Sequence, residues 1–180
     1  MVEVVAEWAG TDRLFQLVFG GVLDLEEATG DGIGSIFIQV TGGQFKAKHV
    51  FHTIRLGLIG GGMSILDTKR LMDTHFDTRP YMENAALAGR ILADLMVGVE
   101  DTKASEGDVD QGALEPHKFS EVSQICRVFN LSPLDLRKLR YADFVNMVRG
   151  FNAASDKKAP HLSEDEFIDI LNRYEPEVTQ

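Results

Sequence analysis

Residues 46–62 read KAKHVFHTIRLGLIGGG and contain the clearest secondary-structure signal in the chain. The apolar residues of this stretch recur at helical spacing: Ala47, Val50, Phe51, Ile54 and Leu58. Residues spaced in this way share one face of an α-helix. The glycines at 60–62 favour either the end of a helix or a site where another segment packs closely. We therefore expect an amphipathic helix over residues 46–59.

A β-hairpin is expected before this helix. Alternate residues of the first segment are apolar and predict a strand: Val2, Val4, Ala6 and Trp8. Residues 9–12 have the composition of a turn, and residues 13–19 predict a second strand with its apolar side formed by Phe15, Leu17 and Phe19. Gly20 and Gly21 are expected to end that strand. Residues 23–28 then predict a short helix that stops at residues 29–32.

Three further segments follow in the first half of the chain. Residues 34–40 (GSIFIQV) fit a strand or a two-turn helix equally well, because β-branched residues lie between glycines. Helices are expected over residues 65–75 and 80–97. The second of these is expected to present one face to a neighbouring helix, made of Met82, Ala85, Ala86, Gly89, Ala93 and Met96.

Residues 100–116 (EDTKASEGDVDQGALEP) are acidic and nearly free of large apolar side chains, which predicts a flexible linker. This linker divides the chain into residues 1–99 and 117–180. The second module is expected to be all helical, with three apolar stripes: Phe119, Val122, Cys126 and Phe129; Tyr141, Phe144, Val145, Val148 and Phe151; and Phe167, Ile170, Leu171 and Tyr174. Ser132 before Pro133, and Ser163 before Glu166, predict helix N-termini. The expected fold class is therefore α+β and mainly helical, with a hairpin, a helical bundle and a small all-α module.

Composition excludes several classes of function. The 180 residues include 18 Lys and Arg against 28 Asp and Glu, so the net charge of −10 disfavours binding to nucleic acid. The basic run at residues 137–140 is interpreted as the last turn of a short helix. Cys126 is the single cysteine, which excludes an internal disulfide and favours a core position. Because no apolar run approaches roughly 18 residues and no signal-peptide pattern is present, we expect a soluble cytoplasmic protein that binds no membrane.

No set of residues indicates catalysis, a metal site or a cofactor. His49 and His52 lie three positions apart, but no acidic neighbour completes a zinc-binding spacing, so both are interpreted as surface or boundary residues. The acidic runs 24–27 and 164–166 are expected on solvated helix faces or first turns. The alternative is an enzyme or small-ligand domain whose site forms only in the fold, with the most plausible cluster being His49, His52, His75 and Asp77.

Two motifs suggest a family. Residues 23–30 (LDLEEATG), followed by Phe45 and by residues 54–62 (IRLGLIGGG), resemble the tail assembly chaperones of gene transfer agents and related tailed phages over about residues 3–98. Residues 129–136 (FNLSPLDL) and 141–144 (YADF) resemble the small helical chaperone encoded beside them. This second segment departs from that pattern at Leu136 and Leu139, where an aromatic residue and a Thr-Pro pair are common. The resemblance favours a helix for residues 34–40, and a chain with both modules looks like a frameshift product.

The resemblance implies a non-enzymatic chaperone that keeps the tape measure protein soluble in the cytoplasm of the bacterial host or producing cell. Other tail proteins or a second copy are further candidate partners. We expect the partner-binding surface to include apolar residues that a small module leaves partly exposed: Phe129, Leu134, Phe144, Val148 and Phe151. The alternative within the same system is a structural tail component, such as an adaptor or terminator, that remains in the particle.

Overall fold

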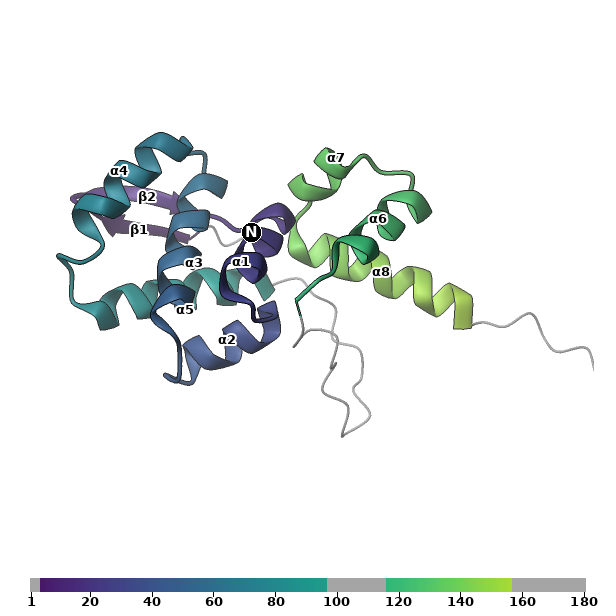
Figure 1. Cartoon of the computed structure of the whole chain (residues 1–180), viewed down its shortest axis with the longest axis horizontal. Coiled ribbons are helices and arrows are strands. Elements are labelled where there is room, and N and C mark those ends of the chain that lie inside the picture. Colours follow the sequence, from purple (N-terminus) through teal and green to yellow (C-terminus); the bar gives the residue numbers. More distant parts are fainter. Residues whose placement is uncertain (1–3, 97–115, 157–180) are drawn as a thin grey trace, which may run out of the picture. The chain divides into compact units, whose positions relative to one another are not determined.

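A computed structural model describes residues 4–96 and 116–156 of the chain (Figure 1). The fold is α+β and mainly helical, as expected. The elements in chain order are β1 (Val4–Trp8), β2 (Thr11–Phe15), α1 (Phe19–Thr29), α2 (Ile33–Thr41), α3 (Ala47–Gly60), α4 (Ile65–His75), α5 (Tyr81–Met96), α6 (Phe119–Val128), α7 (Pro133–Lys138) and α8 (Tyr141–Asp156). One compact unit comprises residues 1–146 and a second comprises residues 147–180.

The N-terminal strands form the expected antiparallel hairpin. Trp8 pairs with Thr11 and Val4 pairs with Phe15, so only Ala9 and Gly10 form the turn. Their φ angles of 53° and 77° give the left-handed turn that matches the twist of paired strands. Val4, Trp8 and Phe15 are buried, which confirms the alternation read from the sequence.

The second strand is shorter than expected, because β2 ends at Phe15 and α1 begins at Phe19. Gly20 therefore lies in the first turn of a helix and does not end a strand. A Cβ atom at Gly20 would lie 2.9 Å from both the Cβ atom and the carbonyl oxygen of Arg137. The glycine permits close packing against a segment more than 100 positions away, a role that local sequence does not reveal. The other end of α1 is as expected, since Gly30 has a φ of 72° and caps the helix.

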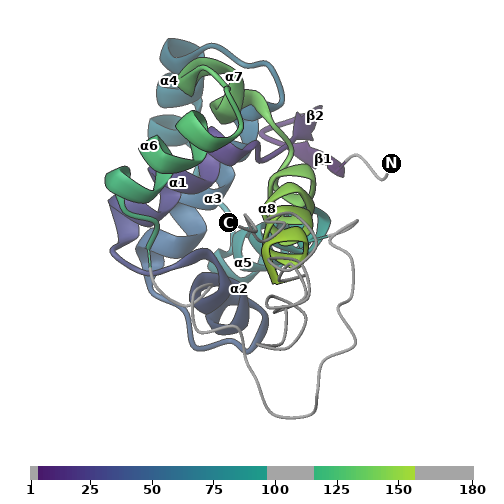
Figure 2. The same ribbon diagram turned by 90° about the vertical axis from the view of Figure 1, so that its right-hand side faces the viewer.

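Helix α3 packs on the hairpin through its glycines. A Cβ atom at Gly60 would lie 2.1 Å from the carbonyl oxygen of Gln16, and one at Gly61 would lie 2.0 Å from that of Leu14. The backbone N–H of Gln16 also donates to the carbonyl oxygen of Gly57 at 2.9 Å. Both interpretations of the glycine run are thus confirmed: it ends the helix and allows backbone to approach backbone. Helix α1 also packs along α3 (Figure 2).

Residues 33–41 form a helix, and α4 and α5 lie where the sequence predicts them. The expected face of α5 is only partly right: Ala85 is buried and Gly89 lies near Val40 of α2, but Ala86 and Ala93 are exposed. Met82 is 67% exposed, whereas the larger aliphatic residues of this helix are buried: Leu87, Ile91, Leu92 and Leu95. These side chains remove more apolar area from water than the small residues of the expected face. Asn84 is also buried, where it accepts a hydrogen bond of 3.1 Å from the Trp8 indole N–H.

The described part of the second module is helical, as expected. The Ser132 hydroxyl accepts a hydrogen bond from the Asp135 backbone N–H at 3.1 Å, with Pro133 in the first turn of α7, so the predicted cap is confirmed. Arg137 and Lys138 form the basic last turn of α7, and Cys126 is buried. The third stripe, the second predicted cap and residues 100–115 of the expected linker lie outside the described residues.

Candidate functional site

Residues 117–144 pack against the first turns of α1. The rings of Phe19 and Phe144 stack with their centroids 3.9 Å apart, and both side chains are buried. The backbone N–H of Phe19 donates to the carbonyl oxygen of Leu139 at 2.8 Å. Val18 forms an isolated antiparallel bridge with Arg140. Apolar and backbone contacts therefore join these two segments.

Glu26 is the polar centre of this contact. Its side chain is 2% exposed, and Oε1 accepts a hydrogen bond of 2.8 Å from the backbone N–H of Ile33. Oε2 accepts from the backbone N–H of His117 at 2.8 Å and lies 2.7 Å from His117 Nδ1. The expectation that the whole acidic run 24–27 faces solvent is therefore wrong for Glu26. Its neighbour Glu27 is exposed, as expected.

The hydrogen bond from His117 to Glu26 raises the pKa of the imidazole above its usual value, and partial burial opposes that shift. The contact with Glu26 therefore favours the protonated form of the His117 ring. A third polar contact lies beside this pair, because Arg137 donates to Asp24 at 2.6 Å and to the carbonyl oxygen of Gly20 at 3.3 Å. Three side chains from residues 117–144 thus contact α1: the ring of Phe144, the imidazole of His117 and the guanidinium group of Arg137.

A groove of about 420 Å³ runs along this contact. It is lined by Leu23, Asp24, Glu27, Pro116, His117, Val122, Pro133 and Arg137. Leu134, which follows the lining residue Pro133, is 70% exposed, and Val128 at the end of α6 is 52% exposed. The groove therefore combines apolar walls with a charged rim, and the exposed Leu134 follows one of its lining residues.

The structure gives the candidate partner-binding residues three different environments. Leu134 and Phe151 are exposed at 70% and 46%, and Phe129 and Val148 are half-buried. Phe144 is 4% exposed, because it is stacked on Phe19, so a partner would reach it only if that packing opened. Val148 and Phe151 belong to the second compact unit.

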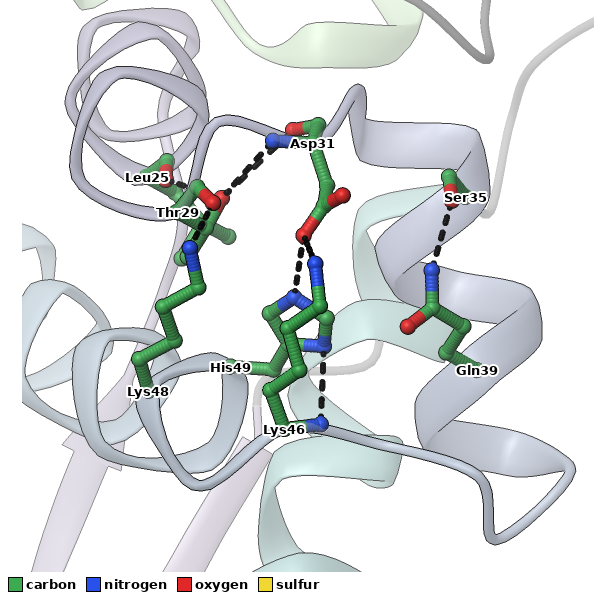
Figure 3. A network of polar contacts seen from close by, with 8 residues as sticks. All are labelled: Leu25, Thr29, Asp31, Ser35, Gln39, Lys46, Lys48 and His49. Carbon is green, nitrogen blue, oxygen red and sulfur yellow. Dashed lines mark hydrogen bonds and ion pairs between the residues drawn. The ribbon is translucent and has the colours of Figure 1, made fainter.

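A second acid–histidine pair joins the α1–α2 turn to the start of α3 (Figure 3). Asp31 Oδ2 lies 2.6 Å from Lys46 Nζ and 2.8 Å from His49 Nε2. These bonds, that of Lys46 first, lower the pKa of the Asp31 carboxyl group. Lys48 donates from Nζ to the carbonyl oxygen of Thr29. His49 is fully buried, so its interpretation as a surface or boundary residue is wrong: it anchors a turn.

The four residues of the alternative enzyme site do not converge. His52 and Asp77 line a cavity of about 510 Å³, and His75 lines a separate cavity of about 350 Å³, while His49 faces Asp31. Burial, followed by the charges of Arg55 and Lys48, lowers the pKa of His52. Within residues 4–96 and 116–156, no three His, Cys, Asp or Glu side chains are placed to hold a metal ion.

A family model described as phage tail tube protein, GTA-gp10, matches residues 2–98, more than half of the chain. The chain belongs to this family of phage tail proteins. The match covers the hairpin and α1–α5, including one wall of the groove, whereas the wall formed by residues 116–137 lies beyond it. We found no significant match among curated proteins or among solved structures.

The family confirms the expectation of a phage or gene-transfer-agent tail protein. Its description refers to the tail tube, so the narrower expectation of an assembly chaperone stays a prediction. Within the described part of the chain, no helix is both long enough and apolar enough to cross a membrane.

Sequence patterns did not identify Glu26, His117 and Arg137, the residues whose polar contacts join α1 to the segment on the other side of the groove. The acidic run containing Glu26 has the composition of a solvated helix face, and its partner His117 lies 91 positions away. The one usable signal was the glycine pair at 20–21, because two glycines inside an apolar stretch indicate close packing of another segment.

Proposed function

We propose that the protein is a non-enzymatic tail assembly chaperone that holds an apolar helical stretch of the tape measure protein in the groove between α1 and residues 116–137. Membership in a phage tail family supports the setting. We place this activity in the cytoplasm of the bacterial host or producing cell. Other tail proteins or a second copy are further proposed partners.

The observation that carries this proposal is the exposure of Leu134 beside the groove. An isolated leucine on a surface needs no explanation, but Leu134 at 70% exposure follows a residue that lines an apolar cavity. Leu23 and Val122 provide apolar walls from α1 and α6. An amphipathic helix binds such a groove by inserting side chains spaced three and four residues apart.

The rim of the groove is suited to a partner that is later released. Asp24, Glu27 and Arg137 surround the apolar walls with charge, and the side chains of Asp24 and Arg137 are 45% and 42% exposed. Charged groups at a rim influence register and association rate more than affinity. The apolar contact would therefore supply a moderate affinity, while the acidic exterior of the protein keeps the complex in solution.

Co-expression with fragments of the neighbouring tape measure gene tests the proposal. We expect the wild-type protein to keep an apolar helical fragment soluble and to co-purify with it. Leu134→Asp should weaken capture by about tenfold, which is the loss expected when an apolar contact residue is replaced by a charged one. Ile65→Asp is the matched control, because Ile65 is 67% exposed and also lies in the first turn of a helix, but that helix, α4, contributes no residue to the groove.

Equal capture by the two variants would place the binding surface elsewhere. Failure of the wild-type protein to solubilise any tape measure fragment would overturn the chaperone function itself. Circular dichroism of both variants should match that of the wild-type protein, because each change lies at an exposed position.

A structural tail component is the second candidate, and the family description favours it, since it refers to the tail tube. Mass spectrometry of purified particles separates the two functions. A chaperone should be absent from finished particles, whereas a structural component should be present in a fixed ratio to the other tail proteins.

A further inference from the structure

Helix α4 is the least covered helix among the α1–α5 elements. Thr68 and Met72 are its two buried residues, and Ile65 and Leu66 are 67% and 58% exposed. The helix lies beside β2, and its other packing partner is α3 (Figure 1). One side of α4 thus remains open while carrying apolar side chains.

A second groove, of about 350 Å³, separates α4 from β2. It is lined by Arg13, Met63, Asp67, Arg70, Leu71, Thr74 and His75. Leu66 precedes Arg70 by one helical turn and extends this surface. We name the surface formed by these residues the α4 groove. Its apolar and basic side chains lie together on a protein whose net charge is −10.

The two arginines of the α4 groove retain charge for a partner. Arg13 donates from Nε to the carbonyl oxygen of Trp8 at 2.8 Å, which fixes the guanidinium group without neutralising it. Arg70 is 73% exposed and lies 4.0 Å from Asp67, the outer limit of an ion pair. Asp67 is itself engaged by the Ser64 hydroxyl at 2.6 Å. The local field therefore favours an acidic, amphipathic ligand.

The sequence contains one segment of this chemistry. Residues 162–174 (LSEDEFIDILNRY) lie outside the described residues and have a predicted helix N-terminus at Ser163. Four acids and one arginine give this segment a net charge of 1 − 4 = −3. Four of its apolar residues have helical spacing: Phe167, Ile170, Leu171 and Tyr174. Both the charge and the apolar stripe complement the α4 groove.

We propose that the α4 groove of one molecule binds residues 162–174 of a second copy. Each chain has one groove and one such segment, so every copy can both accept and donate. Contacts between two different surfaces of identical chains are head-to-tail, and they build closed rings or open filaments. This inference goes beyond the proposed function and uses different residues from those of the groove between α1 and residues 116–137.

Sedimentation velocity of the full-length protein over a concentration series tests self-association, and a labelled synthetic peptide of residues 160–176 tests the contact. We expect the average mass to rise with concentration, and the peptide to bind and to reverse that rise. Added salt should weaken peptide binding, because the contact includes exposed charges.

Arg70→Glu should weaken peptide binding by about tenfold, and a peptide with Lys at positions 166 and 169 should bind this variant better than the natural peptide. Arg90→Glu, at another exposed position, is the control and should leave binding unchanged. Leu66→Asp provides a second test through the apolar side of the groove.

Three results would overturn the proposal. One is a wild-type protein that stays monomeric and does not bind the peptide. Another is an equal effect of Arg70→Glu and Arg90→Glu. The third is a peptide that binds to the protein while the average mass does not change with protein concentration. That result would mean that the segment binds the groove of its own chain.

Discussion

The two regions of the first compact unit are held together by different kinds of contact. In the family-matched region, residues 4–96, the closest contacts join backbone to backbone, as Gly60 and Gly61 do against β2. Residues 116–144 are attached to α1 largely by side chains, namely the Glu26–His117 pair, the Phe19–Phe144 stack and Arg137. The hydrogen bond from the Phe19 N–H to the Leu139 carbonyl oxygen adds a backbone contact. Close backbone-to-backbone contacts tolerate little displacement, whereas side-chain contacts can open through rotamer changes. We infer that the first region is the rigid base and the second is a separable attachment.

The largest expected effect is that of Gly61→Ala. The new Cβ atom would meet the carbonyl oxygen of Leu14 at 2.0 Å, and both partners are backbone, so neither can rotate away. We expect a loss of about 3 kcal/mol or more in the free energy of unfolding, a large part of the total for a typical domain. Urea unfolding followed by circular dichroism measures it. A midpoint within error of the wild-type value would refute the backbone-to-backbone character of this contact.

Glu26→Gln should have a smaller effect, confined to the attachment. The amide keeps one acceptor oxygen, so either Ile33 or His117 would face an N–H group in a site that is 2% exposed. We expect a cost of about 2 kcal/mol. Hydrogen exchange should speed up in α6 and α7 and stay unchanged in α3.

Asp31→Asn is the matched comparison for Glu26→Gln. Its effect should be smaller, because the side chains of Asp31 and Lys46 are 20% and 52% exposed, so water can replace the contact with Lys46. The amide oxygen can still accept a hydrogen bond from the buried ring of His49. Proteolysis offers a second readout. We propose residues 100–116 as the first site of cleavage, after which the wild-type fragments should co-elute and the Glu26→Gln fragments should separate. Equal retention in both proteins would show that the pair does not hold the attachment.

The difference between the two regions also explains which features of the fold could be predicted from the sequence and which could not. Short-range patterns identified α3, the Gly30 cap and the Ser132 cap, because helical period and capping chemistry lie within a few residues. The start of α1 was missed, since Gly20 serves a contact with Arg137 that local sequence does not contain. The groove was missed for the same reason. Glu26 and His117 are separated in the sequence by residues 100–116, the predicted linker.

The attachment should loosen as the pH rises through neutrality. The pKa of His117 is raised in the folded protein by the hydrogen bond to Glu26, so its contribution is full below the usual value of about 6.5 and is lost as the pH rises through the raised value. Asp31 behaves oppositely, because its lowered pKa keeps its contribution until the pH falls below its usual value of 3.8.

Hydrogen exchange at about pH 6 and about pH 8, corrected for the intrinsic rate, measures this loosening. Protection should fall at the higher pH in α6 and α7 of the wild-type protein. The Glu26→Gln variant should lose most of the difference between the two pH values, because the His117 imidazole loses its hydrogen-bonded anionic partner and keeps only the weaker influence of the Glu121 charge. A pH effect that persists in this variant would assign the titration to another group.

Gly89→Ala has the smallest expected effect. It should stabilise residues 4–96, the rigid base, and leave the attachment unchanged. A Cβ atom there would lie 3.9 Å from Val40 Cγ1, which is ordinary van der Waals contact between α2 and α5. Replacing a glycine inside a helix by alanine contributes about 0.5–1 kcal/mol, because the unfolded chain has less freedom to lose. The unfolding midpoint should rise, while exchange in α6 and α7 stays at the wild-type level. Because Glu26 lies on the other contact, the effects of Gly89→Ala and Glu26→Gln should add. A non-additive result would show that base and attachment share one core.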